Sequence, residues 1–153
     1  MSKWHSFRPS PDAGAIVVDD LLFRFLVDLE VQKAQRLRYC VSLACLSVEV
    51  ASAQTREPPR PSLTETIAHD IRGSDVVAQW APAPVALLLI GAETTHVPSI
   101  LRRLMALLDT TTCSAGGSCY PKTAASAQDM LRQAVDSMIE AKQDGGNRLY
   151  VAS

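Results

Sequence analysis

Arg72 and Asp75 are two residues of this 153-residue sequence whose types and spacing could recognise a ligand. The planar guanidinium group of an arginine can bind a phosphate, or the Hoogsteen edge of a guanine, through two parallel hydrogen bonds. The carboxylate of an aspartate can accept hydrogen bonds from the N1–H and N2–H groups of a guanine. The same two side chains can instead pair with each other or with the backbone, so recognition and structure remain alternatives at this point.

The other reactive side chains do not form a pattern that indicates chemistry. The three histidines lack the spacing of metal ligands, and we expect them at the surface or at helix ends. The four cysteines include no Cys-x-x-Cys pair, and we expect them to be reduced and to pack as small hydrophobic residues. These residues are His5, His69, His96, Cys40, Cys45, Cys113 and Cys119. We therefore predict no metal site and no cofactor.

Composition restricts the class of protein. Hydrophobic residues make up 47% of the sequence and charged residues 20%, which is typical of a globular domain. The net charge of −1 provides no basic field for nucleic acid or an acidic membrane surface. The polar N-terminus has no signal-peptide core, and no apolar run reaches the ~20 residues that span a bilayer. We predict a flexible arm at residues 1–14, one domain at residues 15–153, no membrane insertion and a cytoplasmic location.

Apolar periodicity predicts the elements that must position Arg72 and Asp75. The expected order is helix, strand, helix, two strands, helix, strand, helix and strand. These elements are expected at residues 19–37, 41–50, 62–72, 76–80, 85–90, 98–108, 112–120, 126–142 and 149–152. This order predicts an α+β fold of ferredoxin-like type, in which a mostly antiparallel sheet of about five strands is flanked by helices.

The first expected helix has an apolar stripe. Leu22, Phe25, Leu26 and Leu29 recur at helical spacing, and charged residues lie between them. Such a stripe usually packs on the sheet, and we expect that here. Its N-terminal part could alternatively pair with another protomer or with a signalling helix.

Three segments together resemble a known family. Ser114-Ala115-Gly116 followed by Tyr120-Pro121 is similar to the S-x-G-x-x-x-(Y/F)-P strand of GGDEF domains. Residues 134–148 resemble the helix and the G-R-N-R turn that follow this strand, and residues 71–80 resemble the R-x-S-D-x-x-A-R-(Y/W) run that precedes the signature pentapeptide. The matches extend over roughly residues 20–150. The resemblance implies a nucleotidyl-cyclase-type fold and a role in bacterial cyclic di-GMP signalling.

The resemblance also identifies positions at which this sequence departs from the family. Residues 81–85 read Ala-Pro-Ala-Pro-Val where the signature Gly-Gly-Asp/Glu-Glu-Phe is expected. The two metal-binding carboxylates of the family correspond to Ser47 and Ala83, and neither replacement holds Mg²⁺ well. Pro82 has a fixed φ and lacks the N–H of a phosphate-binding glycine. The guanine-reading segment after the first long strand is missing as well. From these losses we predict a degenerate domain that is not an enzyme.

One family site remains in the sequence. Many GGDEF domains bind cyclic di-GMP at an R-x-x-D inhibitory site just before the signature, and Arg72 and Asp75 match it. A further arginine on the next helix often completes that site, and here Arg103 or its neighbour Arg102 falls near this position. The resemblance thus predicts a cyclic di-GMP receptor. The alternative is a protein-interaction or scaffold domain that no longer binds nucleotide, with a protein partner or a second protomer.

Overall fold

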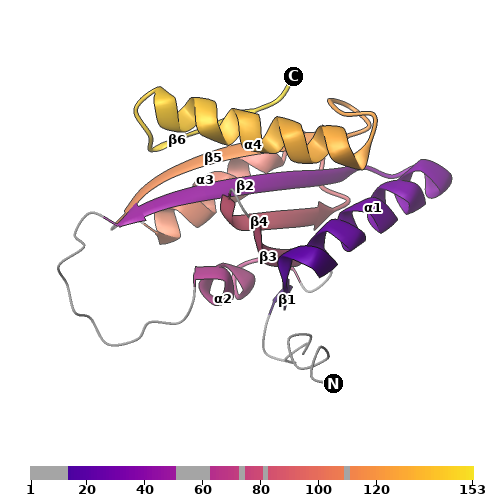
Figure 1. Ribbon diagram of the computed structural model, residues 1–153, viewed down its shortest axis with the longest axis horizontal. Coiled ribbons are helices and arrows are strands. Elements are labelled where there is room, and N and C mark those ends of the chain that lie inside the picture. The colour runs from indigo at the N-terminus through magenta and orange to yellow at the C-terminus, as the bar shows by residue number, and fades with distance from the viewer. Residues whose placement is uncertain (1–13, 51–62, 73–74, 81–82, 109–110) are drawn as a thin grey trace.

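The computed structural model describes residues 14–50, 63–72, 75–80, 83–108 and 111–153 (Figure 1). Its helices are α1 (Asp20–Leu37), α2 (Leu63–Ala68), α3 (Val97–Leu107) and α4 (Ala127–Gln143). Its strands are β1 (Ile16–Val18), β2 (Val41–Val50), β3 (Val76–Trp80), β4 (Ala83–Ile90), β5 (Thr111–Tyr120) and β6 (Arg148–Val151). Residues 1–13 of the expected arm and the proline-rich segment 51–62 lie outside the described residues, and the arm stays a prediction.

The strands form one sheet in the order β1-β3-β4-β2-β5-β6. The three inner pairs, β3–β4, β4–β2 and β2–β5, are antiparallel, whereas β1 and β6 join the edges in parallel. The predicted mostly antiparallel α+β sheet is confirmed. The expectation of about five strands missed β1, because three residues are too few to show a strand period.

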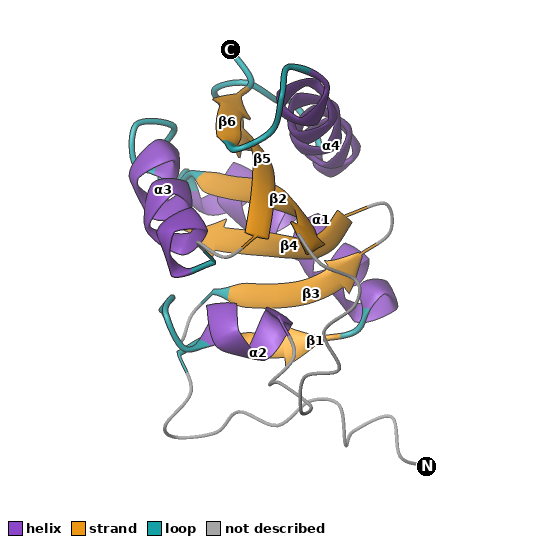
Figure 2. Cartoon of the chain, turned by 90° about the vertical axis from the view of Figure 1, so that its left-hand side faces the viewer, coloured by secondary structure: helices purple, strands orange, loops and turns teal. Residues whose placement is uncertain are grey.

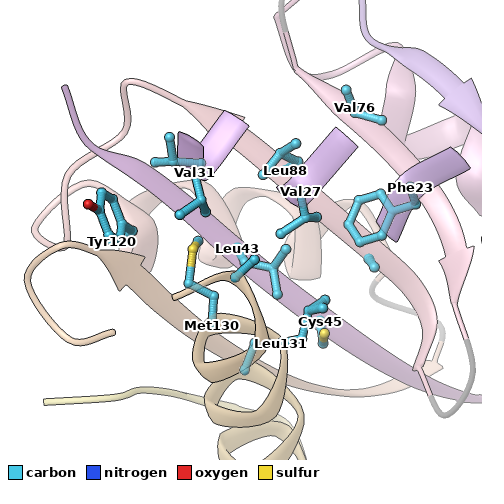
Figure 3. Packing of buried hydrophobic residues seen from close by; sticks show 14 of the residues in the cluster. Phe23, Val27, Val31, Leu43, Cys45, Val76, Leu88, Tyr120, Met130 and Leu131 are labelled. Carbon is cyan, nitrogen blue, oxygen red and sulfur yellow. The ribbon is translucent and has the colours of Figure 1, made fainter. Parts of the chain in front are cut away.

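Helices cover both faces of this sheet, and each face has its own core (Figure 2). On one face, Phe23 and Val27 of α1 and Met130 of α4 pack against the strands (Figure 3). On the other face, Ile67 of α2 and Leu101 of α3 do the same. Side chains of β2 alternate between the two cores, as the twofold period of a strand requires.

The buried face of α1 differs from the predicted stripe. The residues that α1 buries are Phe23, Val27, Val31 and Ala34. Leu22 and Leu26 are only partly buried at the edge of this core, and Phe25 and Leu29 are exposed. The prediction was wrong because α1 carries two apolar stripes with the same helical spacing, and spacing alone cannot identify the one that packs on the sheet.

The approach of β5 to α4 explains a glycine of the resemblance. A Cβ atom at Gly116 would collide with the carbonyl oxygen of Ala134 and the amide nitrogen of Met138 in α4. Only glycine therefore allows the β5 and α4 backbones to come this close. Among the described residues, no helix is both long and apolar enough to cross a membrane.

Candidate nucleotide-binding site

Asp75 ties the start of β3 to the end of β4. Its side chain is buried, with 3% of its surface exposed. One carboxylate oxygen, Oδ1, accepts a hydrogen bond from the Ile90 amide at 2.9 Å, and Oδ2 lies 3.5 Å from Nε of Arg72. Because β3 and β4 pair from Val76 onward, this carboxylate supplies the acceptor that the ladder lacks beyond its last backbone pair.

Arg72 is held at the same place by a second contact. Its Nη2 atom donates to the Ile90 carbonyl oxygen at 2.8 Å, and the Asp75 amide donates to the Arg72 carbonyl oxygen at 3.0 Å. The guanidinium group nevertheless remains accessible, since 64% of the side chain is exposed. Gly73 and Ser74, the middle of the R-x-x-D run, lie outside the described residues.

The electrostatics of Asp75 follow from its burial. Loss of hydration raises the pKa of this carboxyl group above its ordinary value of 3.8. The hydrogen bond from Ile90 and the charge of Arg72 act in the opposite direction and offset only part of that cost. The ionised carboxylate of Asp75 is therefore paired with Ile90 and Arg72, but these contacts do not fully offset its loss of hydration.

Arg103 reaches the same region from α3. Its Nε atom lies 2.7 Å from Oδ2 of Asp70, and its Nη2 atom donates to the Asp70 carbonyl oxygen at 2.9 Å. Arg72, Asp75 and Arg103 all line one open cavity of about 860 Å³. Of the two predicted arginines, Arg103 lines this cavity, whereas Arg102 is exposed on α3 and is not among the lining residues.

Sequence reasoning missed three ionisable residues of this cavity. Asp70, His69 and His96 contribute to its wall, although the histidines showed no ligand-like spacing. The proximity of His69 and Asp70 to Arg72 in the sequence was an available signal, because all three occupy the turn after α2. His96 comes just before α3, and only the folded chain brings it to the cavity.

The cavity retains unused hydrogen-bond donors. A guanidinium group has five N–H donors, and Arg72 and Arg103 each use two of them in the contacts above, which leaves three on each without a partner among the described residues. The formal charges of these arginines are balanced by Asp70 and Asp75. The arrangement can therefore bind an anion through fixed donors, without relying on a large positive field.

The positions of the family's metal carboxylates lie at the opposite end of the sheet. Ser47 of β2 is buried opposite Ser114 of β5, and Ala83 is buried at the start of β4. The neighbouring carboxylate of Glu49 is exposed and lies 2.9 Å from Nζ of Lys142. Ala81 and Pro82 are outside the described residues. Within the part of the chain that is described, no group of three or more His, Cys, Asp or Glu side chains could hold a metal ion.

Comparison with solved structures places this architecture in a fold class. The GGDEF domain of YfiN (TpbB) from Pseudomonas aeruginosa matches with a TM-score of 0.76 and 17% identity, over 88% of this chain and 96% of that one. The GGDEF domain of DgcB from Caulobacter crescentus, in complex with c-di-GMP, matches with a TM-score of 0.75 and 14% identity, over 95% and 96% of the two chains. No family model and no curated protein matches the sequence.

The chain thus has the fold of GGDEF domains, and the resemblance read from the sequence motifs is confirmed at the level of the fold. The prediction that it is not an enzyme, which we drew from the replaced signature and metal-binding residues, is contradicted by this comparison. Structures with this fold include diguanylate cyclases, and one of them is described as the active GGEEF domain of a diguanylate cyclase from Vibrio cholerae. That domain matches with a TM-score of 0.76 and 12% identity, over 88% of this chain and 97% of that one. The fold that this chain shares with active cyclases therefore does not exclude a catalytic role.

Proposed function

We propose that this chain is a signalling domain that binds cyclic di-GMP in the cavity formed by Arg72, Asp75 and Arg103. The observation that carries the proposal is the convergence of two exposed guanidinium groups, from the turn before β3 and from α3, on a single cavity of about 860 Å³. A volume of this order is typical of pockets for small molecules. The DgcB domain of the same fold was solved in complex with c-di-GMP, which supports this class of ligand.

The proposed roles of the three residues differ. Arg72 and Arg103 are 64% and 55% exposed, and their free N–H donors would bind the phosphates or the guanine Hoogsteen edges of the ligand. The Asp75 carboxylate has both oxygens engaged and is 3% exposed, so it acts as a positioning residue that holds Arg72 in place. This assignment modifies the sequence-based prediction, in which Asp75 itself accepted from guanine.

The expected affinity follows from the number of contacts. Charge-assisted hydrogen bonds contribute about 1.5–3 kcal/mol each, whereas micromolar affinity requires about 8 kcal/mol. Two arginine contacts alone therefore fall short of micromolar binding. Stacking of the guanine bases on the guanidinium planes, or on one another in a self-stacked dimer of the ligand, would supply the remainder.

Isothermal titration calorimetry with cyclic di-GMP tests the proposal. We expect Arg72→Ala and Arg103→Ala each to weaken binding by about tenfold or more, which corresponds to the loss of one charge-assisted contact. Arg132→Ala is the matched control, because Arg132 is equally exposed, pairs with Asp129 and lies on α4 outside the cavity. Wild-type protein that gives no heat at high micromolar ligand refutes the proposal, and so does an equal loss of affinity in Arg132→Ala.

The second candidate function is a protein-interaction domain. The observation that favours it is the exposed apolar face of α1, where Leu21, Phe25 and Leu29 are not among the residues that pack on the core. A folded wild-type protein without affinity for cyclic di-GMP would favour this candidate.

A further inference from the structure

The outward face of α1 carries a continuous apolar stripe. Leu21, Phe25 and Leu29 follow one another at intervals of four residues and are 76%, 60% and 38% exposed. Residues at this spacing lie on one side of a helix. The stripe is on the side of α1 away from Phe23 and Val27, which face the sheet, and the helix lies at the surface of the molecule (Figure 1). Three large apolar side chains in a row are more than scattered surface hydrophobicity and indicate an interaction surface.

Charge is distributed unequally along the same helix. Its N-terminal end carries Asp19 and Asp20, and its C-terminal end carries Lys33, Arg36 and Arg38. The helix dipole adds a partial positive charge at the N-terminal end and a partial negative charge at the C-terminal end. These partial charges are opposite in sign to the side chains at the same ends and offset them in part. The formal charges dominate, because whole charges exceed the half charges of a helix terminus. The surface around the stripe is therefore acidic at one end and basic at the other.

We propose that this face binds the same face of a second copy of the chain, with the two α1 helices antiparallel. An antiparallel pair places the acidic start of each helix beside the basic end of the other. A parallel pair would place like charges together at both ends, which costs free energy. With the twofold axis near Phe25, the two Phe25 side chains meet, and Leu21 lies against Leu29 of the second copy.

The charges beside the stripe fit the same register. Arg24 and Asp28 lie on one flank of it, and neither forms an ion pair within the described residues. A twofold axis perpendicular to two antiparallel helices brings the same flank of both copies together. Arg24 of each copy then faces Asp28 of the other. On the opposite flank, Lys33, whose Nζ atom lies 3.0 Å from Oε1 of Glu30 in its own helix, approaches Asp19 of the second copy in the same register.

The size of this surface sets the strength of the interaction. Helix α1 has 18 residues and is about 27 Å long at 1.5 Å per residue. A single pair of such helices is at the small end of specific interfaces. The dimer is therefore expected to form in a concentration-dependent manner, with monomer and dimer in exchange.

Sedimentation velocity of the full chain over a range of concentrations tests the interface. We expect wild-type protein to convert from monomer to dimer, and Phe25→Ser to weaken the dimer by about tenfold or more, as for other central aromatic residues. Leu37→Ser is the matched control, since Leu37 is 66% exposed on α1 but lies off the stripe, and its dimer constant should stay within about twofold. A wild-type protein that remains monomeric up to high micromolar concentration overturns the proposal.

Charge reversal tests the orientation. Arg24→Glu and Asp28→Arg should each weaken self-association by about tenfold, because each places two like-charged pairs across the interface. When the two variants are mixed, each reversed charge faces the other reversed charge, and the two unchanged side chains face each other. Both contacts then join opposite charges, so a heterodimer should form with close to wild-type affinity. Failure of the mixture to associate overturns the antiparallel register, and self-association of either variant at wild-type strength does the same.

Discussion

Replacement of Asp75 by alanine should destabilise the fold strongly, even though Asp75 was identified first as a candidate ligand residue. The carboxylate accepts the Ile90 amide at 2.9 Å and balances the guanidinium group of Arg72. Alanine provides no acceptor at this position. The Ile90 amide, which is partly buried, would lose its hydrogen bond, and β3 and β4 would lose the link beyond their last backbone pair.

The magnitude follows from these contacts. A hydrogen bond to a charged group contributes about 1.5–3 kcal/mol. The ion pair with Arg72 adds only about 0–1 kcal/mol, because the arginine is 64% exposed and solvent screens the interaction. The expected loss is about 2–4 kcal/mol in the free energy of unfolding. Asp75→Asn retains an oxygen acceptor for Ile90 and should lose about half of this.

Urea denaturation followed by circular dichroism measures this loss. The midpoint should decrease without a change in the dependence on denaturant, and the melting temperature should fall by about 2–4 °C per kcal/mol in a domain of this size. Asp136→Ala is a suitable control, because Asp136 is 66% exposed and its nearest cation is 3.9 Å away, and it should change stability by less than about 0.5 kcal/mol. If Asp75→Ala is as stable as this control, the structural role assigned to Asp75 is wrong.

Three further predictions follow from the same structure. Burial raises the folded-state pKa of Asp75 above its unfolded value of 3.8, so protonation of this carboxyl group favours the folded state. The resulting contribution to stability is fully present below pH 3.8 and should decline as the pH rises through the raised pKa. Asp75→Asn should abolish this decline in urea titrations over the acid range. Phe23→Ala should lower the free energy of unfolding by about 3–5 kcal/mol, whereas Phe25→Ala should leave the stability of the monomer almost unchanged in the same titration. Equal losses in the two variants would contradict the assignment of Phe23 to the buried face of α1 and of Phe25 to its exposed face. Gly116→Ala should lower the free energy of unfolding by about 3 kcal/mol or more, because its Cβ meets the α4 backbone. The Cβ of Gly117→Ala meets one methyl group of the buried Val97 side chain and not backbone, so its loss should be smaller; calorimetric melting that reverses this order would contradict the close approach of β5 and α4.

The sequence predicted the local elements well because their signals are local. Asp19 was expected near the start of the first helix and is its N-cap, with Oδ1 accepting the Leu22 amide at 2.8 Å. Ser126 starts α4 in the same way, and its hydroxyl accepts the Asp129 amide. The long strands follow from runs of apolar and β-branched residues, which are favoured on a pleated sheet whether or not the partner strand is known.

The sequence could not determine features that depend on distant partners. Phe23 and Phe25 belong to two stripes of equal spacing, and the choice between them depends on the shape of the sheet surface. Strand β1 forms because β3 presents a free edge to it. The amide of Ile16 in β1 donates a hydrogen bond to the carbonyl oxygen of Asp75, just before β3, at 3.2 Å. His96 reaches the cavity only through the packing of α3 beside the turn after α2. Each of these features depends on a contact between segments that are distant in the sequence, and not on the residues of one segment.

The R-x-x-D run shows how one short pattern can serve two purposes. From the sequence, Arg72 and Asp75 could either recognise a ligand or pair with each other. In the folded chain, the contacts of these two residues with each other and with Ile90 use both oxygens of Asp75, but within the described residues they use two of the five donors of Arg72. The two residues are therefore not equivalent: a change at Asp75 acts mainly on stability, through Ile90, whereas a change at Arg72 removes exposed donors and acts mainly on the cavity. Measurements of stability and of binding on the same variants should therefore give opposite patterns: Asp75→Ala should mainly lower stability, and Arg72→Ala should mainly lower affinity for the ligand.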